Sequence, residues 1–234
     1  MNITCIVQAR MGSERCPGKS MERIAGLPVI EIVLQRIARA SRVSQVVLAT
    51  STLARDDVLA THAENIGFPV YRGSETDLVR RFCEAAREFT SEDYIVRATG
   101  DNVFMDWEEL DRLIKFGVKG NWDFVGFKNE KYPDRLNDFG GEFIRLQSLS
   151  QVDSLTQNAF DREHVFPYFY NHPDLFNVTK IAVNQALWTS IKLDLDYPED
   201  LTLMKLIGEQ ISDPVLTPSS EIVKIATQLM GQGG

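Results

Sequence analysis

Short apolar runs and segments of helical periodicity alternate through the first half of the chain. The run from Ile3 to Val7 is typical of a buried strand, whereas Ile30, Val33, Leu34 and Ile37 repeat at helical spacing. Such patterns predict strands over 3–7, 46–49, 70–71, 94–96 and 124–125, and helices over 29–40, 57–65, 77–89 and 107–116. Alternation of this kind favours right-handed crossovers, and therefore an α/β fold with a mostly parallel sheet and helices on both faces.

The pattern changes between about residues 129 and 173, where glycines and prolines interrupt an aromatic-rich stretch. We predict that this segment leaves the sheet as an excursion within a single domain spanning 1–234. Its aromatic side chains need a surface to cover them, which favours a dimerisation arm that also covers the binding site. The alternative is that they complete the core of one chain. Regular structure is expected to resume at 193–195, followed by helices over 198–207 and 220–230.

Composition narrows the classes of function. The chain has 234 residues, 44% of them hydrophobic, and a formal net charge of −8, which argues against a nucleic-acid partner. An anionic small molecule stays compatible with this charge where cations are locally concentrated. The three cysteines have no paired spacing, which predicts neither disulfides nor a zinc site and favours a reducing, cytoplasmic location. Neither a signal peptide nor a membrane-spanning run is recognisable, so no membrane partner is expected.

The loop after the first strand concentrates cations. Gly12 and Gly18 allow tight backbone turns there, and Arg10, Arg15 and Lys19 bring three positive charges to one short segment. Backbone N–H groups and cations in such a loop suit a polyphosphate. The loop is not a P-loop, because five residues separate the two glycines where a P-loop has four, and no GxGxxG motif follows the strand either.

The loop sequence Gln-Ala-Arg-Met-Gly-Ser-Glu-Arg-Cys-Pro-Gly-Lys, residues 8–19, resembles the cytidylyltransferases that make CMP-activated sugar acids. Relatives in that family are the CMP-ketodeoxyoctulosonate and CMP-sialate synthetases, and the branch of spore-coat polysaccharide biosynthesis proteins is the most similar. The likeness continues in family order at 70–77, 97–101, 161–165 and 196–201. The resemblance implies a Rossmann-like sheet of the nucleotide-diphospho-sugar transferase type, and CTP as the nucleotide.

The resemblance and the cationic loop together suggest roles for individual residues. Arg10, Ser13, Arg15 and Lys19 are expected to bind the triphosphate, since arginine forks and a lysine charge suit phosphate oxygens. We predict that Arg10, Arg15, Lys19 and Asp101 are catalytic. The whole nucleotide-binding set is predicted to comprise Gln8, Ala9, Arg10, Gly12, Ser13, Arg15, Lys19, Arg72, Gly73, Ser74, Asp77, Thr99 and Gly100.

Two carboxylates are implied as metal ligands by the same resemblance. Asp101 follows a strand and a glycine, and Asp196 begins the later Asp-Tyr-Pro-Glu-Asp block. Together with phosphate oxygens and waters they make a plausible octahedral magnesium site. Asp194 is an alternative or auxiliary ligand, because it points the same way as Asp196 if the segment is a strand. A helix N-cap is the commoner role for a single aspartate at such a position, but the pairing with the cationic loop favours the metal-ligand role for Asp101 and Asp196.

The acceptor is expected at Glu142, Arg162, Glu163 and His164, with Arg162 the candidate for an acceptor carboxylate. Gly140 and Val103 depart from the family pattern, which leaves the identity of the acceptor open. We therefore predict transfer of CMP from CTP to an anionic sugar acid by a magnesium-dependent homodimer. The alternatives are a glycosyltransferase that uses a nucleotide sugar, and a non-catalytic nucleotide-binding subunit.

Overall fold

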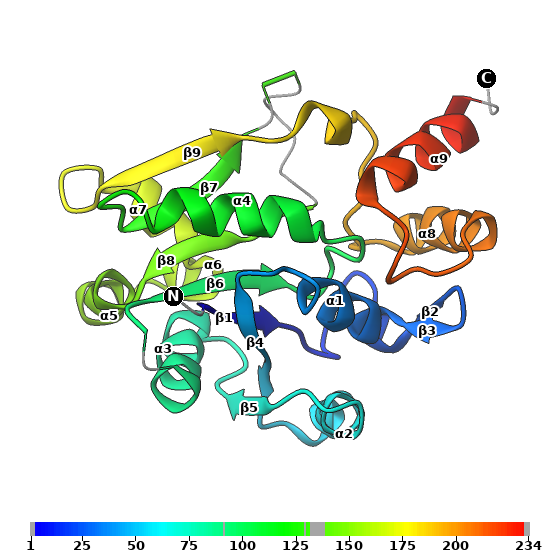
Figure 1. Ribbon diagram of the computed structural model, residues 1–234. Helices are drawn as coiled ribbons and strands as arrows, with labels where there is room; N and C mark the ends of the chain where they lie inside the picture. Colours follow the sequence, from blue (N-terminus) through cyan, green and yellow to red (C-terminus); the bar gives the residue numbers. More distant parts are fainter. Residues whose placement is uncertain (1–2, 91, 129, 132–138, 232–234) are drawn as a thin grey trace.

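The computed structural model describes residues 3–90, 92–128, 130–131 and 139–231 (Figure 1). A seven-stranded sheet runs through the molecule in the order β5-β4-β1-β6-β8-β7-β9. Its strands are β1 (Ile3–Gln8), β4 (Val43–Ser51), β5 (Val70–Gly73), β6 (Tyr94–Thr99), β7 (Phe124–Lys128), β8 (Glu142–Arg145) and β9 (Val178–Ala182), and a separate two-stranded ribbon joins β2 (Arg23–Ile24) to β3 (Leu27–Pro28).

Only β8 breaks the common strand direction of this sheet. The strands β5, β4, β1 and β6 pair in parallel, and β7 pairs in parallel with β9. Strand β8 lies antiparallel to both β6 and β7. The predicted mostly parallel sheet is therefore confirmed. Because Gln8 is in register with both Ala49 and Thr99, the carboxyl ends of β1, β4 and β6 lie at one edge.

Helices cover both faces of the sheet. The helices α1 (Val29–Ile37), α2 (Asp57–Asn65) and α4 (Trp107–Gly117) pack on one face, where they share a core with alternate residues of β1 and β6. The helices α3 (Leu78–Phe89), α5 (Leu146–Leu155) and α7 (Phe166–Asn171) pack on the other. Each face thus has its own apolar core. Residues 54–56, 19–21 and 185–187 form single 3-10 turns.

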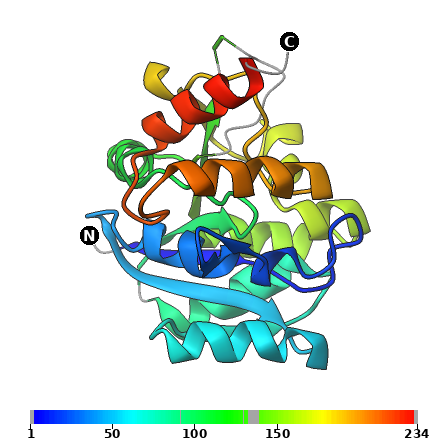
Figure 2. The same cartoon turned by 90° about the vertical axis from the view of Figure 1, so that its right-hand side faces the viewer.

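A third core lies beyond the carboxyl ends of the strands, around α8 (Pro198–Gln210) and α9 (Ser219–Gly231). Figure 2 faces this end and shows α8 and α9 in front of the sheet. The buried guanidinium of Arg36 holds the segment before α9, donating to the carbonyls of Pro214 and Thr217 at 2.8 Å and to that of Met105 at 2.8 Å. The C-terminal segment is thereby fixed to the loop that follows Asp101.

The segment predicted to leave the sheet contributes a central strand instead. Residues 142–145 form β8 between β6 and β7, so the predicted excursion is wrong there. Its start, residues 129 and 132–138, lies outside the described residues. Phe139, Phe143 and Phe169 are at most 2% exposed, whereas Phe160 is 58% exposed. Most of these aromatic residues therefore complete the core of one chain, which is the alternative stated above.

Other element boundaries differ little from prediction. Residues 193–195 form no strand: Leu195 N–H donates to the Asp101 carbonyl at 2.9 Å, but no ladder follows. Within the described ranges, no helix is long and apolar enough to cross a membrane.

Candidate active site

A cavity of about 520 Å³ opens at the carboxyl ends of β1 and β6. It lies between the loop after β1, the loop after β6, helix α3, helix α6 (Ala159–His164) and the segment before α8. Eleven of the predicted site residues line it: Gln8, Ala9, Arg10, Ser13, Arg15, Lys19, Gly100, Asp101, Glu163, His164 and Asp196. Residues from distant parts of the sequence therefore converge on one space.

Local hydrogen bonds give the loop after β1 its shape. Gly18 has φ 77°, a left-handed conformation that favours glycine, and its N–H donates to the Met11 carbonyl at 3.1 Å. Ser13 Oγ accepts from Cys16 N–H at 3.3 Å, and the buried Asp56 accepts from Met11 N–H at 2.7 Å. These hydrogen bonds fix the conformation of the loop backbone and attach it to the segment before α2. The basic side chains therefore extend from fixed backbone positions.

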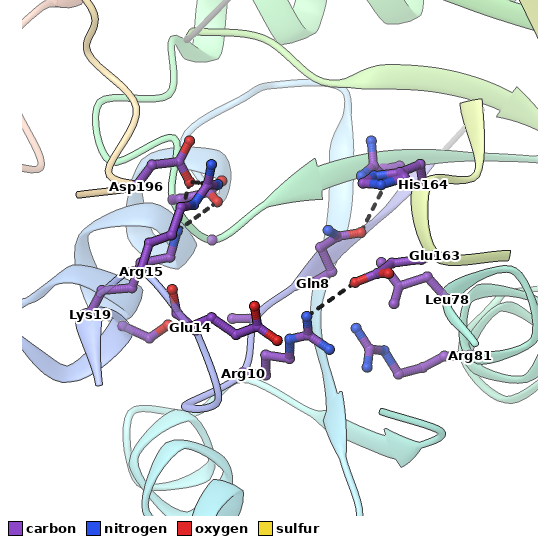
Figure 3. A pocket seen from close by; sticks show the side chains of 16 residues that line it. Gln8, Arg10, Glu14, Arg15, Lys19, Leu78, Arg81, Glu163, His164 and Asp196 are labelled. Atoms are coloured by element: carbon purple, nitrogen blue, oxygen red, sulfur yellow. Dashed lines mark hydrogen bonds and ion pairs between the residues drawn. The ribbon is translucent and has the colours of Figure 1, made fainter. Parts of the chain in front are cut away.

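Lys19 connects the two predicted metal ligands. Its Nζ lies 3.0 Å from Asp101 Oδ2 and 3.2 Å from Asp196 Oδ1, and it also donates to the Leu195 carbonyl. Arg15 Nη2 lies 3.0 Å from Asp196 Oδ1, and its guanidinium stacks on the ring of Tyr197 at 4.8 Å. Arg15, Lys19, Asp101 and Asp196 make up what we call the loop end of the cavity. In Figure 3, Arg15, Lys19 and Asp196 gather at the left.

The segment before α8 presents Asp196 through a capped helix start. Asp200 Oδ2 accepts from the N–H groups of Asp196 and Tyr197 at 2.9 and 2.8 Å, and Pro198 occupies the first helical position. Burial opposes the charge of Asp196, but Lys19, Lys192 and Arg15 outweigh it and hold the pKa of this carboxyl below its usual range. Asp196 is therefore ionised at neutral pH.

The two carboxylates of the loop end fit a hard divalent cation. They approach the same ammonium group from two sides, and oxygen ligands are what magnesium prefers. Among the described residues, no third carboxylate, histidine or cysteine joins them in a metal-binding cluster. Asp194 Oδ1 instead lies 3.4 Å from Lys192, and burial raises the pKa of Asp194, with nearby Asp196 and Asp101 adding to the rise. Phosphate oxygens and water would have to complete the coordination.

Three guanidiniums line the other end of the cavity, those of Arg10, Arg81 and Arg97, which we call the arginine end. Arg10 Nη2 lies 3.2 Å from Glu163 Oε1, and Arg10 Nη1 donates to the Glu75 carbonyl at 3.2 Å. Figure 3 shows Arg10 near the centre, with Glu163 and Arg81 to its right, away from Asp196. Cationic side chains therefore lie at both ends of the cavity.

Arg162 does not reach the cavity, although it was the candidate for the acceptor carboxylate. Its side chain is 11% exposed, and its guanidinium binds both oxygens of Asp77 at 2.9 and 2.6 Å and Asp153 Oδ1 at 2.7 Å. It also donates to the carbonyls of Asp153 and Thr156. With these contacts the guanidinium is fully used inside the protein, and it joins α6 to the start of α3.

The other predicted residues outside the cavity lining have partners or supporting positions. Arg72 pairs with Asp57 at 2.7 Å and donates to the carbonyl of Ser51. Asp77 caps α3 by accepting from Arg80 N–H, and Ser74 supplies its carbonyl to Arg81. Glu142 holds Arg97. Gly12 and Thr99 adjoin the lining residues Ser13 and Gly100 in the chain, and Gly73 packs beside the lining residue Arg81, but none of the three lines the cavity itself.

Five lining residues are outside the predicted site set: Glu14, Ser20, Leu78, Arg81 and Arg97. A signal existed for Arg97, because it is the single charge in the otherwise apolar strand β6 and is 3% exposed. Arg81 had a weaker signal, since it lies beside Phe82 on the buried side of α3. A charge placed among apolar positions points to a built site more often than a charge on a polar face does.

The sequence is similar to a known protein family and to proteins of other organisms. The family model described as cytidylyltransferase matches residues 4–222. An uncharacterized protein of Methanocaldococcus jannaschii is 31% identical over 204 residues, covering 87% of this chain and 82% of its own. The spore coat polysaccharide biosynthesis protein SpsF of Bacillus subtilis is 29% identical over 232 residues, covering 96% and 93% of the two chains.

Solved structures show the same fold. A cytidylyltransferase from Leptospira borgpetersenii superposes with a TM-score of 0.88 at 25% identity, covering 99% of this chain and 96% of its own. A CMP:2-keto-3-deoxy-manno-octonic acid synthetase in complex with CTP superposes with a TM-score of 0.70 at 15% identity, covering 90% and 100%. The predicted Rossmann-like, nucleotidyltransferase-type architecture is thereby confirmed.

Proposed function

Since this chain belongs to the cytidylyltransferase family, we propose that it transfers CMP from CTP to an anionic sugar and releases pyrophosphate. The acceptor is a 2-keto-3-deoxy or nonulosonic sugar acid, and the product serves cell-surface polysaccharide synthesis. Relatives named for spore-coat polysaccharide and for 3-deoxy-manno-octulosonate cytidylyl transfer support this choice of acceptor class.

The loop end carries the proposal. There a Gly-containing loop brings Arg15 and Lys19 within 3.0 to 3.2 Å of the carboxylates of Asp101 and Asp196. Nucleotidyl transfer needs both signs of charge in one place, because cations must offset the triphosphate while carboxylates hold a divalent metal. A simple anion-binding loop would have no use for the two carboxylates.

In the proposed reaction an acceptor hydroxyl oxygen attacks the α-phosphorus of CTP. The bond from that phosphorus to the bridging oxygen breaks, pyrophosphate leaves, and the hydroxyl proton passes to solvent. Arg15 and Lys19 neutralise charge on the phosphates, and Arg10 and Ser13 help to orient them, so that catalysis rests on positioning and electrostatics. Asp101 and Asp196 would hold magnesium, which supplies further charge neutralisation on phosphate oxygens when bound.

A pyrophosphate-release assay tests this function. Each of the four ribonucleoside triphosphates is incubated with magnesium and a panel of sugar acids, and pyrophosphate is measured against reactions without acceptor. We expect release with CTP that depends on one class of sugar acid. A glycosyltransferase would release no pyrophosphate, and a non-catalytic subunit would bind CTP without turnover; either result contradicts the proposal.

We further propose that the chain is located in the cytoplasm and forms a homodimer. All three cysteines are buried and free, which fits a reducing compartment. Leu155 and Phe160 expose apolar surface at the end of α5 and the start of α6, and a second copy of the chain would cover it. Sedimentation of the purified chain tests the dimer, which a monomeric mass at micromolar concentration would exclude.

A further inference from the structure

Arg97 is held rigidly in the floor of the cavity. Its side chain is 4% exposed; Nε donates to Gln8 Oε1 at 3.1 Å, and Nη1 pairs with Glu142 Oε2 at 3.0 Å. The ring of Phe166 lies 4.9 Å from the guanidinium carbon and that of Phe82 lies 5.8 Å from it. Nη2 has no hydrogen-bond partner among the described residues, and Arg97 lines the cavity. A fixed, buried cation therefore retains donors for a ligand.

Arg81 adds a second buried cation beside it. Arg81 is 1% exposed and donates Nη1 to the carbonyl of Ser74 at 2.8 Å. Its Nε has no partner, and no carboxylate pairs with it among the described residues. Burial lowers the pKa of Arg81 to about 10, and the charges of Arg10 and Arg97 contribute to the shift. In the part of the chain that the structure describes, the three guanidiniums of the arginine end thus pair directly with only two carboxylates, those of Glu142 and Glu163.

We infer that Arg97, assisted by Arg81, binds the carboxylate of the acceptor and that Gln8 and Glu142 position the Arg97 guanidinium. This inference rests on the proposed function. The loop end together with Arg10 has the groups that a triphosphate and a metal need, which leaves Arg81 and Arg97 of the arginine end for the acceptor (Figure 3). Arg162 has no free donor for this task, because Asp77 and Asp153 take its guanidinium. Since Glu142 already balances Arg97, one additional negative charge suits the site better than the two of a phosphate.

If Arg97 binds the acceptor carboxylate, the enzyme should prefer an acidic acceptor to a neutral analogue. The best sugar acid from the panel is compared with its C1 carboxamide, and the ratio of kcat/KM values gives the preference for the acid. Arg97→Gln should lower this preference roughly 10- to 100-fold, the loss expected for a charge-assisted hydrogen bond, with the KM for CTP unchanged. Arg97→Lys, which keeps the charge without the fork, should recover part of it.

Further variants guard against a folding defect and test positioning. The double variant Arg97→Gln with Glu142→Gln leaves no half-buried carboxylate without its partner, and it should show the same loss of preference. Glu142→Gln alone still accepts a hydrogen bond from Arg97, so the preference should fall only about threefold, and Glu142→Ala should lower it further. Arg145→Gln is the matched control for Arg97→Gln, because Arg145 lies on β8, the strand of Glu142, and pairs with Asp123 outside the cavity lining; it should retain the full preference.

The outcomes separate this inference from the proposed function. If wild-type protein releases pyrophosphate from CTP but Arg97→Gln keeps its preference for the acid, Arg97 is not the acceptor site and the function stands. A preferred acceptor without a carboxylate, such as a sugar phosphate, overturns the inference and the proposed acceptor class, whereas CMP transfer from CTP stands. If wild-type protein releases no pyrophosphate with any acceptor, the proposed function itself fails.

Discussion

The loop end and the arginine end of the cavity balance their charges differently. At the loop end Arg15 and Lys19 face Asp101 and Asp196, so that each charge has a protein partner at 3.0 to 3.2 Å. At the arginine end the guanidiniums outnumber the carboxylates paired with them, and Arg97 keeps unused donors. A ligand that binds at the loop end must displace existing ion pairs within the protein. A ligand that binds at the arginine end can instead pair with donors that have no partner yet. Substitutions at the loop end should therefore reduce the rate of pyrophosphate release, and substitutions at the arginine end should weaken the preference for an acidic acceptor.

The largest effect is expected from Asp101→Asn. The substitution keeps the size of the side chain and removes the charge that faces Lys19 and the proposed metal. Loss of several kcal/mol of transition-state stabilisation predicts a fall of roughly 1,000-fold in the rate of pyrophosphate release at saturating CTP. Initial rates measure this, and circular dichroism checks the fold.

Asp174→Asn is the matched control for Asp101→Asn, because Asp174 is exposed and outside the cavity lining. It should retain the full rate. If the rate of Asp101→Asn stays within tenfold of the wild-type rate, the charge of Asp101 is not needed for catalysis. The proposed difference in function between the two ends would then be wrong.

An intermediate effect is expected from Arg162→Gln, and it should appear in stability. The change leaves Asp77 and Asp153 without their shared cation at a site where Arg162 is 11% exposed. Because both aspartates keep some solvent contact, we expect the free energy of unfolding to fall by about 2–3 kcal/mol. Urea denaturation measures it. The preference for the acid over the carboxamide should not change. Loss of this preference would instead mean that Arg162 binds the acceptor carboxylate.

The sheet and the loop end were predictable because their signals are local in sequence. Apolar runs predicted β1, β4 and β6 at nearly the right places, and the loop after β1 carries its glycines and cations within twelve residues. Residues at the carboxyl ends of parallel neighbours must share an edge, so Asp101 could be placed near that loop without coordinates. The order of strands and helices was therefore enough to predict that Asp101 lies near the loop after β1.

The arginine end and β8 were not predictable in this way. Strand β8 has four residues, and Gly140-Gly141 before it suggested a loop; in the structure a Cβ at Gly141 would come 2.5 Å from the Arg97 carbonyl, so glycine lets the chain approach β6. Glu142 meets Arg97 only through this antiparallel pairing. The ion pair with Asp77 that helps to take Arg162 away from the cavity joins residues 85 positions apart. Long-range pairing of this kind leaves no periodic signal.

The smallest effect is expected from Tyr197→Phe, and its size distinguishes two ways of orienting Arg15. The hydroxyl accepts from Arg15 Nη1 at 3.2 Å, while the ring stacks on the same guanidinium at 4.8 Å. Both side chains are substantially exposed, so losing the hydrogen bond alone should raise the KM for CTP only about two- to threefold. Tyr197→Ala, which also removes the ring, should raise it further because the stacked guanidinium gains freedom. Equal effects of the two variants would assign the orientation of Arg15 to the hydroxyl, and a rise above tenfold for Tyr197→Phe would mean that the hydroxyl contacts the nucleotide itself.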